Sequence, residues 1–107
     1  MNVITNDSLR STIALAALEQ VVDPEIGLNI VDLGLIYQVD FDEAEKKIFL
    51  TMTLTTSFCP MGESITSAVK RVMENTFKEM DTLVELTFNP PWTHERISEE
   101  GKAFLNR

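Results

Sequence analysis

The residue with the richest chemistry in this sequence is Cys59, which stands directly before Pro60. Proline suits the first position of a helix, because its missing N–H is not needed there. Cys59 is therefore expected at the N-cap of the helix that follows, where exposed N–H groups and a partial positive charge favour a thiolate. The thiolate is the form that binds metals or attacks electrophiles. Glu63, in the first turn, opposes this effect, and the alternative interpretation is a cysteine that packs as a small apolar residue.

Cys59 is the only cysteine of the chain. Iron–sulfur clusters usually need about four protein ligands, so one thiolate cannot hold a cluster alone. If Cys59 contacts iron or a cluster, the other ligands must come from a second copy, another protein or small thiols. We therefore expect a transient contact in a transfer or adaptor role, and no tightly bound cofactor.

Two carboxylates, Asp23 and Glu25, flank Pro24. A pair this close could bind a hard cation or act as acid and base. The alternative is that Asp23 ends the preceding helix by turn chemistry while Glu25 is solvated, and the sequence does not decide between the two.

A corner near the C-terminus carries Trp92 after two prolines, followed by His94 and Arg96. Trp92 is expected to pack over the end of the sheet, with an interaction anchor as the alternative. His94 is interpreted as a surface residue, although it could pair with Cys59 as in cysteine-nucleophile enzymes. Arg96 could hold a carboxylate such as Asp23 or Glu25, or be a surface charge.

The elements that must position these residues follow from the apolar periodicity. Alternation predicts three strands, and a helical repeat predicts two long helices and one short one. The strands are expected at Leu35–Phe41, Ile48–Leu54 and Leu83–Phe88, the long helices at Leu9–Val22 and Met61–Met80, and the short helix from a cap at Thr93 or Ser98 through Leu105. The residues expected to face the core are Leu35, Tyr37, Val39 and Phe41 in the first strand, Ile48, Leu50, Met52 and Leu54 in the second, a stripe that begins with Leu9 and Ile13 in the first helix, and a stripe that begins with Ile65 and Val69 in the second.

This order, α-β-β-α-β-α, predicts an α+β fold. The first two strands form an antiparallel hairpin, and the second long helix crosses to a third strand that is parallel to the second. The result is a small three-stranded mixed sheet with helices packed mainly on one face. The Asp23–Gly27 loop, the Thr55–Pro60 connector and the Pro90–Arg96 corner are then predicted to converge at one end of this sheet.

The chain has 107 residues, which corresponds to one domain over residues 1–107. Its net charge of −8 makes nucleic acid an unfavourable partner and provides no polybasic patch for a membrane. No apolar run reaches the roughly 18 residues of a membrane span, and the N-terminus lacks the pattern of a secretory signal. Together with the lone cysteine, these features predict a cytoplasmic protein.

Several motifs also resemble a known family. They are, in chain order, Asp23-Pro24-Glu25, Asn29-Ile30-Val31-Asp32-Leu33-Gly34-Leu35-Ile36-Tyr37, Met52-Thr53-Leu54-Thr55 leading to Cys59-Pro60, and Phe88-Asn89-Pro90-Pro91-Trp92 with Glu95-Arg96. This set resembles the SufT/PaaD-like family of iron–sulfur assembly factors, whose eukaryotic relatives serve cytosolic iron–sulfur targeting. The match runs from about the first helix to Arg96.

The resemblance implies a fold similar to the C-terminal domain of NifU-type scaffolds and a non-enzymatic maturation role. It implies that Cys59 is the functional residue and that scaffold or carrier proteins and client apoproteins are the partners; a homodimer is compatible with it. The residues expected to contact a cluster or a partner are Cys59, Asp23, Glu25, Thr55, Thr56, Trp92 and Arg96. Gly62-Glu63-Ser64 is more polar than is usual in the family after the Cys-Pro-Met motif.

Three alternatives remain open at this stage. Family members also act in phenylacetate hydroxylase systems, so the client is not fixed. A cysteine-nucleophile enzyme would use Cys59 with His94 or Glu25 as the base. A pure protein-interaction module would use Cys59 only for packing.

Overall fold

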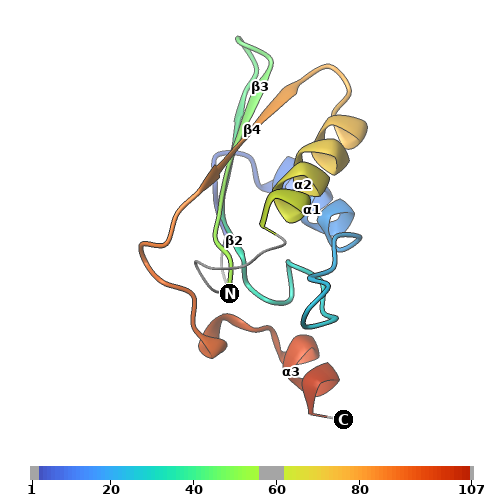
Figure 1. Ribbon diagram of the computed structural model, residues 1–107. Coiled ribbons are helices and arrows are strands. Elements are labelled where there is room, and N and C mark those ends of the chain that lie inside the picture. The colour runs from blue at the N-terminus through green and yellow to red at the C-terminus, as the bar shows by residue number, and fades with distance from the viewer. Residues whose placement is uncertain (1–2, 56–61, 107) are drawn as a thin grey trace.

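The centre of the fold is a four-stranded sheet, seen in a computed structural model that describes residues 3–55 and 62–106 (Figure 1). The outer strands are parallel to their neighbours, and the two central strands form an antiparallel hairpin. The strands lie side by side in chain order as β1 (Ile4–Thr5), β2 (Ile36–Asp42), β3 (Lys47–Met52) and β4 (Asp81–Leu86). The predicted α+β class and mixed sheet are confirmed, but the prediction of three strands was wrong. A strand of two residues is too short to show alternation in a sequence, which explains why β1 was missed.

Two adjacent side chains join β1 to the first helix. The Asn6 amide exchanges two hydrogen bonds of 2.9 Å with the backbone of Phe41, which extends the pairing of β1 with β2 by one step. Asp7 is the N-cap of α1 (Ser8–Leu18), and its carboxylate accepts a hydrogen bond from the Arg10 N–H at 3.0 Å. The predicted N-terminal end of this helix is thereby confirmed to within one residue.

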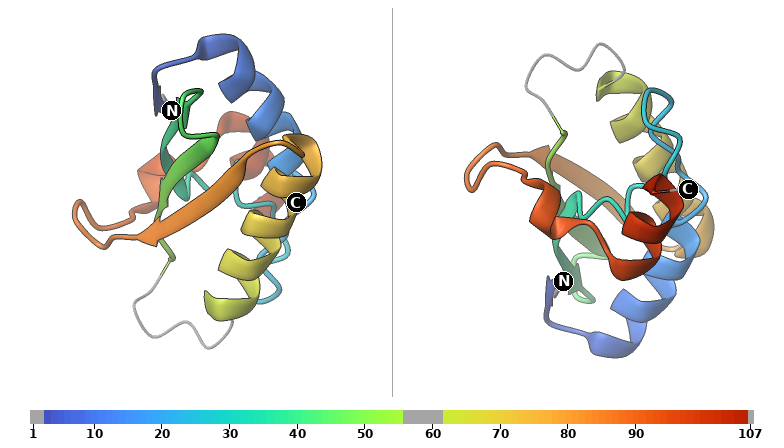
Figure 2. Two further views of the ribbon diagram at one scale, coloured as in Figure 1. Left: turned by 90° about the horizontal axis from the view of Figure 1, so that it is seen from above. Right: turned by 90° about the horizontal axis from the view of Figure 1, so that it is seen from below.

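The helices α1 and α2 (Gly62–Thr76) cover the same face of the sheet (Figure 2). The short helix α3 (Glu99–Leu105) follows the 3-10 turn η1 (His94–Arg96) and lies beyond the end of the sheet (Figure 1). Of the two predicted caps, Ser98 is the one that begins α3, because its hydroxyl accepts a hydrogen bond from the Gly101 N–H at 3.0 Å.

The apolar core lies between the helices and the covered face of the sheet. Alternate residues of the hairpin supply it, and the predicted inward-facing set is buried throughout: Leu35, Tyr37, Val39 and Phe41 in the first run, and Ile48, Leu50, Met52 and Leu54 in the second. Val69 of α2 is also fully buried, as predicted. Ile36 is buried as well, against the expected alternation, because the register shifts between Ile36 and Gln38.

The C-terminal end of α1 comes earlier than predicted. The sequence predicted a helix to Val22, but α1 ends at Leu18. The following backbone pairs with the next loop instead: the Asp23 N–H donates to the Leu28 carbonyl and the Ile30 N–H donates to the Val21 carbonyl. These bonds take the chain out of the helix before Pro24 is reached.

The buried face of α1 also differs from the prediction. The predicted stripe began with Leu9 and Ile13, but their side chains are 73% and 46% exposed. The helix instead buries Ser11, Ala14 and Leu18. The small residues at the first two positions let α1 approach its neighbours closely.

The second long helix is shorter than predicted, and the last strand lies nearer the N-terminus than predicted. α2 ends at Thr76 instead of Met80, and β4 begins and ends two residues before the predicted Leu83–Phe88. Lys70 connects the two elements, because its ammonium donates to the Glu74 carboxylate at 2.9 Å and to the Thr82 carbonyl at 2.7 Å.

Candidate functional site

The stretch of residues 28–37 contacts two of the three loops that the sequence singled out, and it also contacts Thr53, two residues before the third. Its Leu28 carbonyl accepts a hydrogen bond from the Asp23 N–H at 3.0 Å, and its Leu35 carbonyl accepts one from the Thr53 N–H at 2.8 Å. Its Leu33 carbonyl accepts one from the indole N–H of Trp92 at 2.6 Å. The Asp23–Gly27 loop and the Pro90–Arg96 corner therefore meet at one segment, in the lower half of Figure 1. Whether the Thr55–Pro60 connector joins them stays a prediction, because only Thr55 of it lies within the described residues.

Asp23 and Glu25 have different environments. The Asp23 side chain is 1% exposed, and its carboxylate accepts a hydrogen bond from the Glu25 N–H at 2.9 Å. The Asp23 carbonyl accepts hydrogen bonds from Ile26 and Gly27, at 3.3 and 2.7 Å. Glu25 is exposed. Asp23 thus organises the turn and Glu25 is solvated, as in the second interpretation of the sequence. Asp23 does not end the helix, however, because α1 already ends at Leu18.

The connector that carries Cys59 leaves the sheet after Leu54. Thr55 is half-buried and is the last residue described before the connector, while Thr56 and Cys59 lie outside the described residues. The chain is described again from Gly62, where an added Cβ would lie 3.0 Å from a methyl group of Leu54. The two ends of the connector are therefore close together, and the predicted N-cap role of Cys59 stays a prediction.

The Pro90–Arg96 corner packs on the stretch of residues 28–37. Trp92 is half-buried and packs against the core, while its predicted position over the end of the sheet stays a prediction. Arg96 differs from both expectations: its Nε donates to the Gly34 carbonyl at 3.0 Å and its guanidinium lies 4.0 Å from the centre of the Tyr37 ring. It is neither the partner of Asp23 or Glu25 nor a simple surface charge, because a backbone carbonyl and an aromatic face hold it.

His94 lies on the surface, as predicted. It is exposed in η1, and its ring centre is 5.0 Å from that of Trp92. The nucleophile alternative requires a base within hydrogen-bond reach of the sulfur. Because Cys59 lies outside the described residues, that geometry stays untested.

A polar network that the sequence analysis missed fixes α3 to the rest of the site. Asp32 accepts hydrogen bonds from the Asn29 amide at 2.7 Å and from the Ser98 hydroxyl at 2.8 Å. The Ser98 N–H also donates to the Asp32 carbonyl at 2.8 Å. The spacing of Asn29 and Asp32, three residues apart in a turn, was the available signal.

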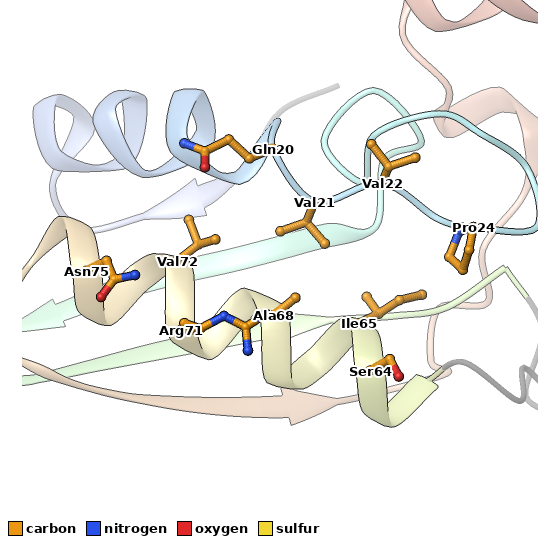
Figure 3. Close-up of a pocket in the computed structure, with 10 residues that line it drawn as sticks. All are labelled: Gln20, Val21, Val22, Pro24, Ser64, Ile65, Ala68, Arg71, Val72 and Asn75. Carbon is orange, nitrogen blue, oxygen red and sulfur yellow. The ribbon is translucent and has the colours of Figure 1, made fainter.

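A groove of about 420 Å³ lies beside this site, between α2 and the chain that follows α1 (Figure 3). One wall comes from α2 and the other from the end of α1 and the start of the Asp23–Gly27 loop. The lining residues are Gln20, Val21, Val22, Pro24, Ser64, Ile65, Ala68, Arg71, Val72 and Asn75. The sequence analysis missed the groove, although Ser64, Ala68, Val72 and Asn75 follow one another at helical spacing.

The described residues offer no group of three or more histidine, cysteine, aspartate or glutamate side chains that could hold a metal ion. Among them, one carboxylate stands out by its pKa, that of Glu74, which lies below its usual value because the Lys70 ammonium and then the Thr82 N–H donate to it. No helix in the described part of the chain is long and apolar enough to cross a membrane.

Comparison with known proteins identifies the family. Residues 12–86 match the family model described as "Iron-sulfur cluster assembly protein". The chain belongs to this family. The predicted resemblance is thereby confirmed, on a match that includes the Asp23–Gly27 loop, residues 28–37 and Cys59.

Two relatives whose names state a role are similar to this chain over most of their length. The "Fe-S protein maturation auxiliary factor YitW" of Bacillus subtilis is 45% identical over 91 residues, which cover 85% of this chain and 88% of that protein. The "Fe-S protein maturation auxiliary factor SufT" of Staphylococcus aureus is 42% identical over 85 residues, covering 79% and 96%. A crystal structure of a domain of unknown function from Bacillus anthracis has a TM-score of 0.86 at 40% identity, covering 92% and 93%.

Proposed function

We propose that this chain is an accessory factor in the maturation of iron–sulfur proteins. The observation that carries this proposal is the family match together with the two relatives named as maturation auxiliary factors, at 45% and 42% identity over most of the chain. In this role the iron–sulfur cluster is cargo that passes to a client apoprotein.

The proposed role is non-enzymatic and uses Cys59 for a transient contact with iron, a cluster or a partner. One cysteine provides too few ligands to hold a cluster. A scaffold or carrier protein and the client apoprotein would supply the remaining ligands, and a second copy of the chain is a further source. The predicted cytoplasmic location stays a prediction.

The described contacts divide the other predicted site residues into two groups. Glu25 and Thr55 are at least partly accessible, so we propose that they contact the partner together with Thr56. Asp23, Trp92 and Arg96 hold backbone groups of the Asp23–Gly27 turn and of Leu33 and Gly34. We therefore assign them to positioning the loops.

Removal of the protein from its own cells tests this proposal. The expected result is that iron–sulfur enzymes lose activity while their polypeptides accumulate as apoproteins, and that iron and sulfide added to the extract restore the activity. Enzymes without a cluster are the control and should keep their activity. Undiminished iron–sulfur enzyme activity in these cells, during growth with limiting iron, would show that the assignment is wrong.

A further inference from the structure

The groove beside α2 reaches the first turn of this helix. In Figure 3 it runs along α2 from Asn75 to Ser64, and Pro24 lies opposite the first turn of the helix. Ser64 is two residues from Gly62, where the connector ends. A chain seated in the groove would therefore reach the first described turn of α2.

The lining of the groove has an unusual charge for this protein. The chain carries seventeen acidic residues in 107 and a net charge of −8. None of the ten lining residues is acidic, and one of them, Arg71, is a cation. Beyond Val22, the neighbouring hollow between this loop and α3 is lined by Glu19, Asp32 and Glu100. The lining of the groove thus carries one positive charge and no negative charge, on a molecule that is acidic as a whole.

Arg71 is available for a partner within the described part of the chain. It is exposed, and it takes part in none of the ion pairs found among residues 3–55 and 62–106. Glu74, three residues further along, is bound by Lys70 on the β4 side of the helix. The side-chain amides of Gln20 and Asn75 also line the groove and add hydrogen-bonding groups to it.

The rest of the groove is apolar and short. Val21 and Ile65 are buried, and half-buried Ala68 and Val72 present small aliphatic surface between them. From Ser64 to Asn75 the helix rises about 17 Å, at about 1.5 Å per residue. An extended chain covers this length with about five residues.

We propose that this groove binds a short apolar segment of a partner protein, and that a carboxylate of this segment pairs with Arg71. Arginine binds carboxylates through two parallel hydrogen bonds, which sets the direction of the bound chain as well as its affinity. This proposal adds a binding site to the proposed maturation role. It depends on that role in one respect, because the partner would be the protein that gives or receives the cluster.

Selection of peptides from a displayed library of random 12-residue sequences, with the full-length chain as the target, tests this proposal. We expect the enriched peptides to share two or three apolar residues and one aspartate or glutamate. A synthetic peptide of this sequence should bind Arg71→Glu at least tenfold more weakly than the unchanged protein and Arg71→Gln less weakly than Arg71→Glu. Replacing its acidic residue by lysine should reverse the preference between the unchanged protein and Arg71→Glu.

The matched control is Lys78→Glu, which makes the same kind of charge reversal at an exposed residue outside the groove. Binding to this variant should stay within twofold of the unchanged protein. An absence of enriched peptides, enriched peptides without a carboxylate, or equal binding to Arg71→Glu would overturn the proposal. Since no client enzyme is measured, the outcome is independent of whether the maturation role holds.

Discussion

Asp23 is buried although its side chain is acidic, and its own turn supplies hydrogen bonds to both its side chain and its backbone carbonyl. The Glu25 N–H donates to the Asp23 carboxylate, and the N–H groups of Ile26 and Gly27 donate to its carbonyl. A buried polar group costs free energy unless it is hydrogen-bonded. The acidic pair is thus one structural residue and one accessible residue, Glu25.

Gly34 is the residue whose replacement should most disturb the site. Its φ is +77°, and an added Cβ would lie 2.7 Å from the Arg96 Cβ. Gly27 has a similar φ of +82° but no atom within 4 Å of the added Cβ. We expect Gly27→Ala to lower the free energy of unfolding by about 1 kcal/mol through backbone strain, and Gly34→Ala to cost at least about 1 kcal/mol more through the additional clash.

Denaturant unfolding of both variants measures this difference directly, since they share the strain and differ in the clash. Equal losses of stability would show that Arg96 does not pack on Gly34 as described. The sequence left Arg96 either a carboxylate partner or a place as a surface charge, because residue types reveal only charged partners. Its actual partners are a backbone carbonyl and the Tyr37 ring, and a backbone carbonyl has no signature in a sequence.

At the scale of elements, α1 shows where periodicity is insufficient. Its sequence, SLRSTIALAAL, is apolar on more than one side. The stripe that begins with Leu9 and Ile13 and the stripe of Ala14 and Leu18 are both helical, and only packing against the sheet and α2 decides between them. By contrast, α2 has one apolar stripe, and its predicted core residues Ile65 and Val69 are both buried.

Alanine substitutions in α1 test this assignment of its faces. Leu18 is fully buried, so Leu18→Ala should lower the free energy of unfolding by about 2–5 kcal/mol. Leu9 is 73% exposed, so Leu9→Ala should change it by less than about 0.5 kcal/mol. If denaturant unfolding shows a larger loss of stability for Leu9→Ala than for Leu18→Ala, the buried face is the one predicted from the sequence and this assignment is wrong.

The contact between α2 and β4 should depend on pH through Glu74. The Lys70 ammonium, and then the Thr82 N–H, lower the pKa of the Glu74 carboxyl below its usual value of 4.5. A carboxyl whose pKa is lower in the folded state stabilises the fold above the unfolded-state pKa, and this contribution is lost as the pH falls through the folded-state pKa. Glu74→Gln should therefore melt at a lower temperature than the unchanged protein at pH 7.

The same comparison at lower pH supplies the internal control. The difference in melting temperature should stay constant between pH 7 and about pH 5.5 and then shrink as the pH falls below 4.5. A difference that grows toward acid pH would contradict the lowered pKa of Glu74.

At the scale of the whole molecule, the hairpin and the crossover through α2 could be predicted because each rests on a strong local pattern. The β2–β3 hairpin alternates over a sufficient length, and the buried stripe of α2 is long. The two-residue β1, the network of Asp32 with Ser98 and the groove beside α2 could not be predicted in the same way. Each depends on residues that are brought together from distant parts of the sequence.

The whole-molecule arrangement also explains why one cysteine is sufficient for the proposed role. Both ends of the connector that carries Cys59 lie at the end of the sheet where the Asp23–Gly27 loop meets the first turn of α2. The groove leads toward this point, so a bound partner would bring its own ligands there. In the proposed role, the fold positions the partner and Cys59 contributes a single soft ligand.

The central claim is tested most directly by the activity of an iron–sulfur enzyme in cells that lack this protein and produce either the unchanged chain or Cys59→Ser at equal levels. Serine is close to cysteine in size, so the variant should melt like the unchanged protein, within roughly 1 kcal/mol of stability. Its hydroxyl stays protonated and is a poor ligand for iron–sulfur chemistry, where soft thiolates are preferred. The account predicts that the unchanged chain restores the enzyme activity and that folded Cys59→Ser leaves it at the level of cells without the protein. Full restoration of activity by Cys59→Ser would contradict it.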